Sequence, residues 1–275
     1  MHIFNTIFGK IFDVIFWPFQ RMSPWVGMAV ISLLTGLFML FIFRHTSNQA
    51  GIRKVKNRIK AHLLELRLFK DNLGLSLKAQ GNILKNNARY IGYSGKPLLV
   101  MIIPLVLILI QLNFWFGYLP LQPGEKAILK VKLKEGVSAI ATAVDLRAEP
   151  PLVIETPALR IEEEREIDWR FSASEPGFYN LEIIVDGVTV TKTVQVIRKS
   201  LQKITPIKPR KNFIDQVFNP GEKPISSSTP LESIEVTYPE MRFGFLGLRL
   251  HWIIAYFALS IVFGFALKGV FGVEI

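Results

Sequence analysis

A short basic segment between two long apolar runs constrains the topology of the whole chain. Residues 44–96 contain twelve Lys or Arg residues and two acidic ones, Glu65 and Asp71, which gives a net charge of +10. The full chain carries +11, so this segment holds nearly all of the basic excess. Loops rich in Lys and Arg beside membrane spans stay in the cytoplasm. The segment therefore predicts a cytoplasmic loop flanked by two spans.

Three apolar stretches are expected to cross a membrane as helices, because about 20 residues at about 1.5 Å each span the hydrocarbon core. They are residues 25–43, 98–116 and 246–267. With residues 44–96 inside, the N-terminus is outside, residues 119–242 are extracytoplasmic and the C-terminus is cytoplasmic. The sequence thus predicts a multi-pass protein of the plasma (inner) membrane.

Residues 1–22 are expected to form an amphipathic helix that lies in the membrane interface. Apolar residues recur at helical spacing from Ile3 to Phe19, and polar residues fill the opposite face. A signal peptide would begin with basic residues and continue in a charge-free run to a cleavage site of small residues, a pattern absent before Pro24. The alternative is an apolar helix that packs against the rest of the protein.

The basic segment is predicted to fold as a helical hairpin. Apolar residues three or four apart form one stripe between residues 49 and 69, and a shorter helical pattern covers residues 75–89. Turn-forming residues occupy positions 71–74 between them. Three helix-breaking residues are expected to end the second helix before the next span begins: Gly92, Gly95 and Pro97.

Two motifs resemble the YidC/Oxa superfamily of membrane insertases. Phe41-Ile-Phe-Arg44-His-Thr-Ser-Asn-Gln is similar to the stretch in which an arginine ends the first core helix and a basic hairpin follows. Gly95-Lys-Pro97-Leu-Leu-Val-Met-Ile-Ile-Pro104 is similar to the start of the next core helix. The resemblance covers residues 1–118 and, more loosely, the third span. With three spans, the chain resembles archaeal YidC-like proteins and the insertase-like subunit of the ER membrane protein complex.

This resemblance implies a non-enzymatic insertase or assembly factor with a hydrophilic groove open to the cytoplasm and to lipid. Arg44 matches the family's arginine and would attract the polar or acidic flank of a client membrane protein. Polar residues inside the spans must face each other or water, and they are assigned to the same groove: Ser32, Thr35 and Ser260. Their alternative role is hydrogen bonding between helices, and that of Arg44 is a topological anchor. Because bacterial insertases have five spans, an additional membrane subunit or a homo-oligomer is implied.

The basic hairpin is expected to contact anionic lipid headgroups, with the ribosome as an alternative partner. The residues assigned to this contact are Arg53, Lys54, Lys56, Arg58 and Lys60. The four histidines are scattered, and the chain has neither a nucleophile motif nor a phosphate-binding glycine loop. We therefore expect no enzymatic activity, no cofactor and no metal site.

Short alternating runs predict an all-β, Ig-like sandwich outside the membrane at residues 119–200. The runs cover residues 127–133, 138–144, 166–171, 179–185 and 188–196. Asp186-Gly187 predicts a hairpin turn, and the acidic residues at 162–168 predict a solvated strand face, with a cation site as the alternative. Prolines between 206 and 239 predict an extended linker at residues 201–242.

The fold class expected from these patterns is an α-helical polytopic membrane protein with an inserted β-sandwich. Its predicted parts are the interfacial helix (1–22), two spans with the hairpin (23–118), the sandwich (119–200), the linker (201–242) and the third span with a short tail (243–275). A second functional hypothesis treats the spans as anchors of an envelope scaffold or adaptor. In that case the Ig-like domain would bind a protein or glycan partner.

Overall fold

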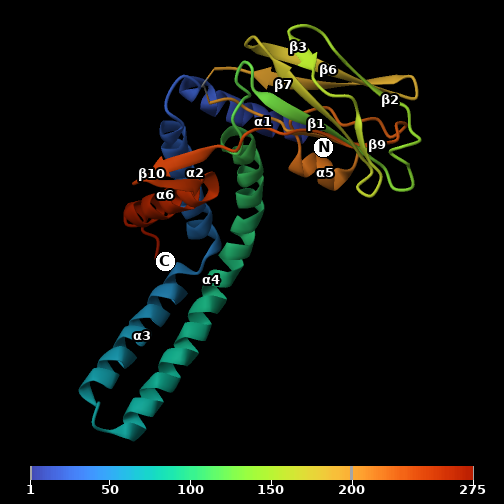
Figure 1. Ribbon diagram of the computed structural model, residues 1–275. Helices are drawn as coiled ribbons and strands as arrows, with labels where there is room; N and C mark the ends of the chain where they lie inside the picture. Colours follow the sequence, from blue (N-terminus) through green and yellow to red (C-terminus); the bar gives the residue numbers. More distant parts are fainter. Residues whose placement is uncertain (1, 199–200, 275) are drawn as a thin grey trace. The chain divides into compact units, whose positions relative to one another are not determined.

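The computed structural model describes residues 2–198 and 201–274, with side chains from residue 8 onward (Figure 1). The side chains of Ile3, Phe4 and Ile7, which belong to the predicted N-terminal stripe, lie outside this description. The chain divides into two compact units. We call residues 1–27 with 109–252 the sandwich unit, and residues 28–108 with 253–275 the helical unit.

Among the described residues, two helices are long and apolar enough to cross a membrane by length and composition: α2 (Pro24–Thr46) and α4 (Leu73–Phe116). The third predicted span is shorter than expected, because α6 (Trp252–Leu267) has 16 residues. At about 1.5 Å per residue it is about 24 Å long, less than the about 30 Å of a hydrocarbon core.

The start of the third predicted span, residues 246–251, belongs to a hairpin of β10 (Arg242–Phe245) and β11 (Leu248–His251). Phe245 pairs with Leu248 around a two-residue turn in which both Leu246 and Gly247 have positive φ. Such a turn matches the twist of two antiparallel strands. Its apolar residues extended the hydropathy pattern of the span, and the prediction of 22 helical residues was therefore wrong at its first six positions.

The helical hairpin is confirmed, and its second arm continues without interruption into the second apolar helix. α3 (Gln49–Leu68) lies antiparallel to the first part of α4 (Figure 1). The predicted break at Gly92, Gly95 and Pro97 is wrong, since α4 contains Pro97 and Pro104 inside one helix of 44 residues. Proline has no N–H to donate to the carbonyl four residues earlier. A helix can still contain it when that carbonyl accepts a hydrogen bond from another donor.

The N-terminal segment consists of α1 (His2–Phe16) and the short 3-10 helix η1 (Trp17–Phe19). Phe12 and Phe16 are buried, and the Phe16 ring stacks on Trp115 with 4.6 Å between centroids. Ile11, Val14 and Trp17 are exposed. Part of the apolar surface of α1 therefore packs inside the sandwich unit, as in the alternative to an interfacial helix, and another part is left uncovered.

Two sheets face each other in the sandwich unit and enclose one core. The larger sheet has the order β3-β5-β1-β9-β8 with β4 also paired to β5, and the smaller has the order β2-β6-β7. The larger sheet consists of β1 (Lys126–Leu133), β3 (Leu152–Ile154), β4 (Leu159–Ile161), β5 (Glu166–Ala173), β8 (Ile207–Pro209) and β9 (Leu231–Val236). The smaller consists of β2 (Val144–Ala148), β6 (Gly177–Val185) and β7 (Val188–Val196).

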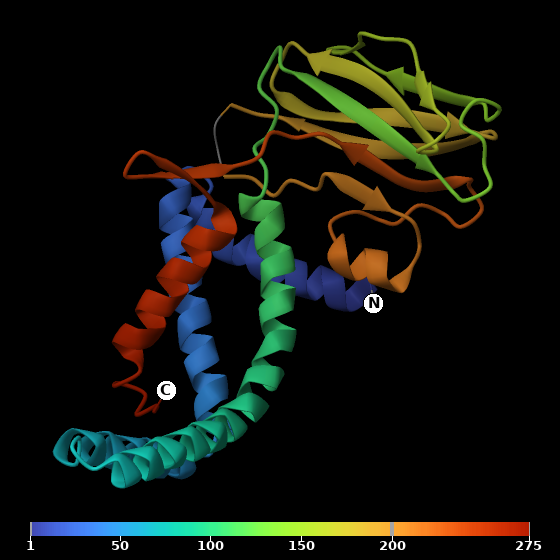
Figure 2. The same cartoon turned by 60° about the horizontal axis from the view of Figure 1, so that its bottom comes forward.

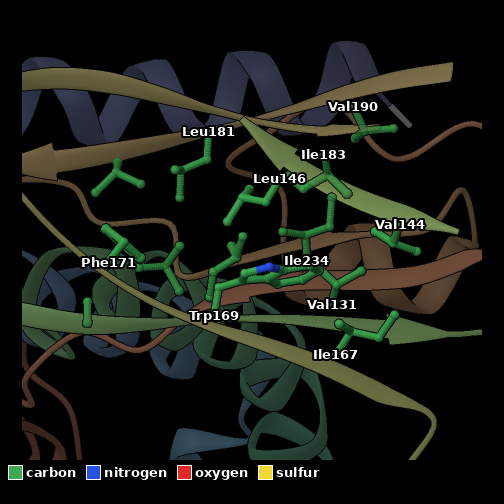
Figure 3. Packing of buried hydrophobic residues seen from close by; sticks show 14 of the residues in the cluster. Val131, Val144, Leu146, Ile167, Trp169, Phe171, Leu181, Ile183, Val190 and Ile234 are labelled. Atoms are coloured by element: carbon green, nitrogen blue, oxygen red, sulfur yellow. The ribbon is translucent and has the colours of Figure 1, made fainter. Parts of the chain in front are cut away.

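Strand register explains why the core forms where it does. Trp169, Leu129 and Val236 occupy one row across three strands of the larger sheet, and all three are buried. The smaller sheet adds Leu146 paired with Ile183 from the other side (Figure 3). Alternation of apolar and polar residues places each apolar set on the inner face. The β-sandwich is thus confirmed, whereas its relation to immunoglobulin domains stays a prediction.

Two predictions within this unit are wrong for local reasons. Residues 138–143 form turns and not a strand, because the Ser138 carbonyl accepts from the Thr142 hydroxyl at 2.6 Å and the Ser138 hydroxyl accepts from the Ala141 amide at 3.2 Å. These local bonds compete with strand pairing. The segment predicted as a linker contributes β8, β9 and the short helix α5 (Phe213–Phe218). β9 pairs with β1 and buries Leu231, Ile234 and Val236, so it belongs to the sandwich core.

Candidate functional site

A pocket of about 410 Å³ lies between three helices of the helical unit. We call it the helical pocket. α2, α4 and α6 each contribute residues at helical spacing, so each presents one face to it. The lining residues are Thr35, Gly36, Met39, Leu40, Phe43, Leu98, Met101, Leu105, Tyr256, Phe257, Ser260, Ile261, Gly264 and Phe265.

Small residues let α2 and α6 approach closely at this pocket. A Cβ atom added to Gly36 would lie 3.5 Å from the Ser260 carbonyl oxygen and 3.6 Å from the Gly264 backbone nitrogen. A methyl group at position 36 would therefore already be in van der Waals contact with the backbone of α6, which shows how closely the two helices approach. Small residues serve the same purpose where helices pack in membranes. In the sequence, the signal for this contact is Gly36 within one apolar helix, together with Ser260 and Gly264 four residues apart in another.

The polar groups of the pocket are hydroxyls, and none of its lining side chains is charged. Thr35, Tyr256 and Ser260 line it, and the rest of the wall is apolar or glycine. Ser32 does not belong to the lining; its buried hydroxyl donates to the Tyr256 carbonyl oxygen at 3.5 Å and links α2 to α6. The pocket can therefore accommodate an apolar segment that carries an occasional hydroxyl or amide group.

One group of pocket residues also packs against the C-terminal tail. Leu40 and Phe43 form a buried cluster with Ile52 of α3 and Val273 of the tail. The next residue, Glu274, binds two cations of α3: its carboxylate lies 3.4 Å from Arg53 Nε and 3.3 Å from Lys56 Nζ. The hydrogen bond and charge of Lys56 hold the pKa of the Glu274 carboxyl below its usual value.

The residues that sequence reasoning assigned to a groove occupy three kinds of position. Thr35 and Ser260 both line the helical pocket, and Ser32 lies behind its wall. Arg44 is exposed in the last turn of α2 and is not a lining residue, although it directly follows Phe43, which is one. Tyr256 was missed; its position four residues before Ser260, on the same face of α6, was the available signal.

The five cations assigned to lipid or ribosome contact have unequal surroundings. Arg53 and Lys56 are ion-paired with Glu274, whereas Lys54, Arg58 and Lys60 are exposed on α3. Arg53 and Lys54 also border a shallow hollow with Gln49, Ala50 and Asn57. The hairpin therefore keeps cations available for an external anionic partner while two of them hold the tail.

The sandwich unit contains a buried ion pair that sequence reasoning did not find. Lys192 of β7 is fully buried, and its ammonium group donates to the Glu222 carboxylate and, at 2.6 Å, to the Thr205 carbonyl oxygen. Burial lowers the pKa of the Lys192 ammonium, and the charge of Glu222 opposes that shift. The signal was the position of Lys192 between Val190 and Val194 on the inner face of one strand.

The acidic run at residues 162–168 does not form a metal site: within the described residues, no group of three His, Cys, Asp or Glu side chains could hold a metal ion. Asp168 instead lies near Glu166 on β5, opposite Lys130 on β1. Burial and the Glu166 charge raise the pKa of the Asp168 carboxyl to about 6. Lys130 donates to Glu166 at 2.9 Å and partly offsets the crowding of negative charge.

No protein-family model, no curated protein and no solved structure matches this chain.

Proposed function

We propose that this protein is a membrane-protein insertase or assembly factor that holds an apolar part of a client segment in the helical pocket. The observation that carries the proposal is an apolar pocket with a few hydroxyl groups between three apolar helices. Its volume of about 410 Å³ can be compared with one turn of a client helix. A helix about 10 Å across rises about 5.4 Å per turn, so one turn fills about 420 Å³.

The proposed mechanism needs no nucleotide, because transfer of an apolar helix into lipid is itself favourable. The pocket receives one turn of the client, and the hydroxyls of Thr35 and Ser260 satisfy polar groups that would be costly in hydrocarbon. The client helix then moves sideways into lipid. Arg44, exposed next to Phe43, attracts the acidic flank of the client from outside the pocket. The groove of this proposal is therefore mainly apolar, with its charge at Arg44.

The same proposal places the chain in the plasma membrane with the basic hairpin in the cytoplasm. The helices α2 and α4, which are long and apolar enough to cross a membrane, support it. The excess of Lys and Arg in residues 44–96 supports the orientation. The resemblance of residues 1–118 to the YidC/Oxa superfamily supports the type of activity.

Two adjacent substitutions in α2 test the pocket. Met39 lines it, whereas its neighbour Phe38 is exposed and does not. Met39→Trp fills the pocket and is expected to abolish client insertion, while Phe38→Trp preserves it. Each variant is expressed in a strain depleted of the wild-type protein, and membrane proteomics measures the proteins that depletion removes.

Equal restoration of those proteins by Met39→Trp and Phe38→Trp, at matched protein levels, would rule out the pocket as the client site. If depletion instead removes one stable extracytoplasmic protein, the chain acts as an envelope scaffold or adaptor. A hollow of about 720 Å³ beside β2 and β6, bordered by the exposed Phe178, favours that second function. Phe178→Ser would then release the partner.

A further inference from the structure

A second pocket, of about 270 Å³, lies in the sandwich unit between α1 and the segment that returns from β8 toward β9. We call it the lysine pocket, because Lys10, Lys203 and Lys223 line it. Gln216 and Asn219, from α5 and its C-terminal cap, add amide groups. Figures 1 and 2 both show α5 beside α1. Three separate parts of the chain thus bring their polar side chains to one place.

The two carboxylates that line this pocket are already paired with lysines, Asp13 with the pocket's own Lys203 and Glu222 with lysines outside the lining. Asp13 lies 2.9 Å from Lys203 Nζ, and Glu222 binds Lys192 and lies 3.8 Å from Lys208 Nζ. Lys10 and Lys223 are exposed and have no ion-pair partner among the residues whose side chains are described. Two positive charges are therefore left at the pocket, and their natural ligand is an anion.

The segments that line the pocket also carry uncovered apolar side chains. Val14 and Trp17 of the N-terminal segment are 74% and 75% exposed. α5 exposes Phe213, Ile214 and Phe218 at more than half of their surface. Aromatic and aliphatic side chains next to lysines are typical of segments that lie in the boundary between headgroups and acyl chains. The exposed face of α5 gives a second anchoring element that residues 1–22 alone do not provide.

We propose that the lysine pocket holds the phosphate headgroup of an anionic membrane lipid, while α1 and α5 bury their exposed apolar side chains in the same leaflet. A volume of about 270 Å³ equals that of about nine water molecules, at about 30 Å³ each. A phosphoglycerol group, with about ten non-hydrogen atoms, fits this space. Lysine ammonium groups and side-chain amides are suitable donors to phosphate oxygens. The inference shares the membrane location of the proposed function and requires nothing of the helical pocket.

The test is amide hydrogen exchange of the full-length protein in detergent during titration with phosphatidylglycerol or phosphatidylcholine. Residues 8–17 and 213–224 report on the lysine pocket separately from the basic hairpin, which can bind anionic lipid independently. Phosphatidylglycerol is expected to protect them and phosphatidylcholine is not. Lys10→Gln/Lys223→Gln is expected to weaken this protection about 30-fold, since each lysine near an anionic surface contributes about a fivefold effect.

Lys126→Gln/Lys132→Gln is the matched control, because it removes two lysines from β1 of the same unit and is expected to leave protection unchanged. Ile214→Asn/Phe218→Asn, which removes apolar anchors without changing charge, is expected to weaken binding of the long-chain lipid. Equal protection by the two lipids, or equal behaviour of the two lysine variants, would overturn the proposal. If glycerol phosphate in water protects these residues as well as the lipid does, the ligand is a soluble phosphate ester and the lipid assignment is wrong. A failure here leaves the Met39→Trp result unaffected, so the two proposals can fail independently.

Discussion

Replacement of Lys192 by methionine tests whether the buried ion pair fastens the returning segment to the sandwich. Methionine keeps an unbranched apolar stem of similar length and removes the ammonium group. In the wild type, that group joins β7 to Thr205 and Glu222, which belong to the segment that sequence reasoning described as a linker. We expect Lys192→Met to loosen this attachment while the sandwich core stays packed.

The free energy lost in Lys192→Met depends on the contacts that Glu222 keeps. Loss of one partner from a buried ion pair costs about 3–5 kcal/mol, because the other charge stays buried. The Glu222 side chain is 14% exposed, and it keeps a hydrogen bond from the Thr205 hydroxyl at 2.9 Å and Lys208 Nζ at 3.8 Å. These contacts favour the lower end of the range, about 3 kcal/mol. The double variant Lys192→Met/Glu222→Leu removes both charges and is expected to recover most of the loss.

Hydrogen exchange of the returning segment, at residues 203–209 and 220–224, measures the effect locally in the full-length protein. A loss of about 3 kcal/mol corresponds to exchange about 100-fold faster. The matched control is Lys126→Met, which removes one of the two cations paired with Glu155. Lys126 Nζ lies 3.2 Å from that carboxylate, and the lysine side chain is 62% exposed. An exposed pair contributes less than about 1 kcal/mol, so the control should change exchange less than about fivefold. If Lys192→Met accelerates exchange no more than Lys126→Met does, the fastening role is refuted.

Two other features allow direct tests. The pKa of Asp168 is raised from 3.8 to about 6 in the folded protein, so its stabilising contribution is complete below the unfolded pKa and is lost as the pH rises through about 6. After allowance for solvent screening, we expect the sandwich to lose about 1 kcal/mol between about pH 4 and about pH 7. Asp168→Asn should flatten this dependence in a urea titration, and an unchanged slope would exclude Asp168 as its source. The chain has no cysteine, so a single cysteine at Ser226 or at Asn57 reports topology by labelling. We expect Ser226→Cys to react only from outside and Asn57→Cys only from the cytoplasm; the reverse pattern would contradict the proposed orientation.

Periodicity predicted the elements whose partners lie nearby in sequence. α3 begins and ends close to the predicted stripe, and the turn at Asp186-Gly187 joins β6 to β7 as expected. Predictions failed where long-range pairing decided the outcome. β9 reaches β1 across about a hundred residues, and no local pattern in a proline-rich segment indicates such a partner. At Ser138, local hydrogen bonds decided the outcome: they formed turns where the alternating pattern had predicted a strand.

For the candidate sites too, local sequence patterns indicated some residues, whereas the way these residues come together depends on long-range packing. Thr35 and Ser260 could be chosen from sequence, because a polar residue in an apolar helix needs a partner or a polar cavity. That both line one pocket with Tyr256 depends on how α2 and α6 pack against each other, and the close approach of the two helices at Gly36 is a tertiary contact that no sequence pattern indicates. Arg44 was chosen by the resemblance and by its position at the end of the first predicted span; it is exposed and is not among the residues that line the pocket.

The cations of the sandwich unit and those of the hairpin differ in what they can bind. In the sandwich unit most cations with short contacts are used internally, as in the pairs of Lys126 with Glu155, Lys130 with Glu166 and Lys192 with Glu222. In the hairpin, twelve cations share the segment with two acidic residues, so most have no internal carboxylate to bind. Exposed charges of this kind are screened beyond about 8 Å at physiological ionic strength, whereas a buried pair is screened much less. Salt should therefore weaken the proposed contact of the hairpin with an anionic surface and leave the attachment at Lys192 intact.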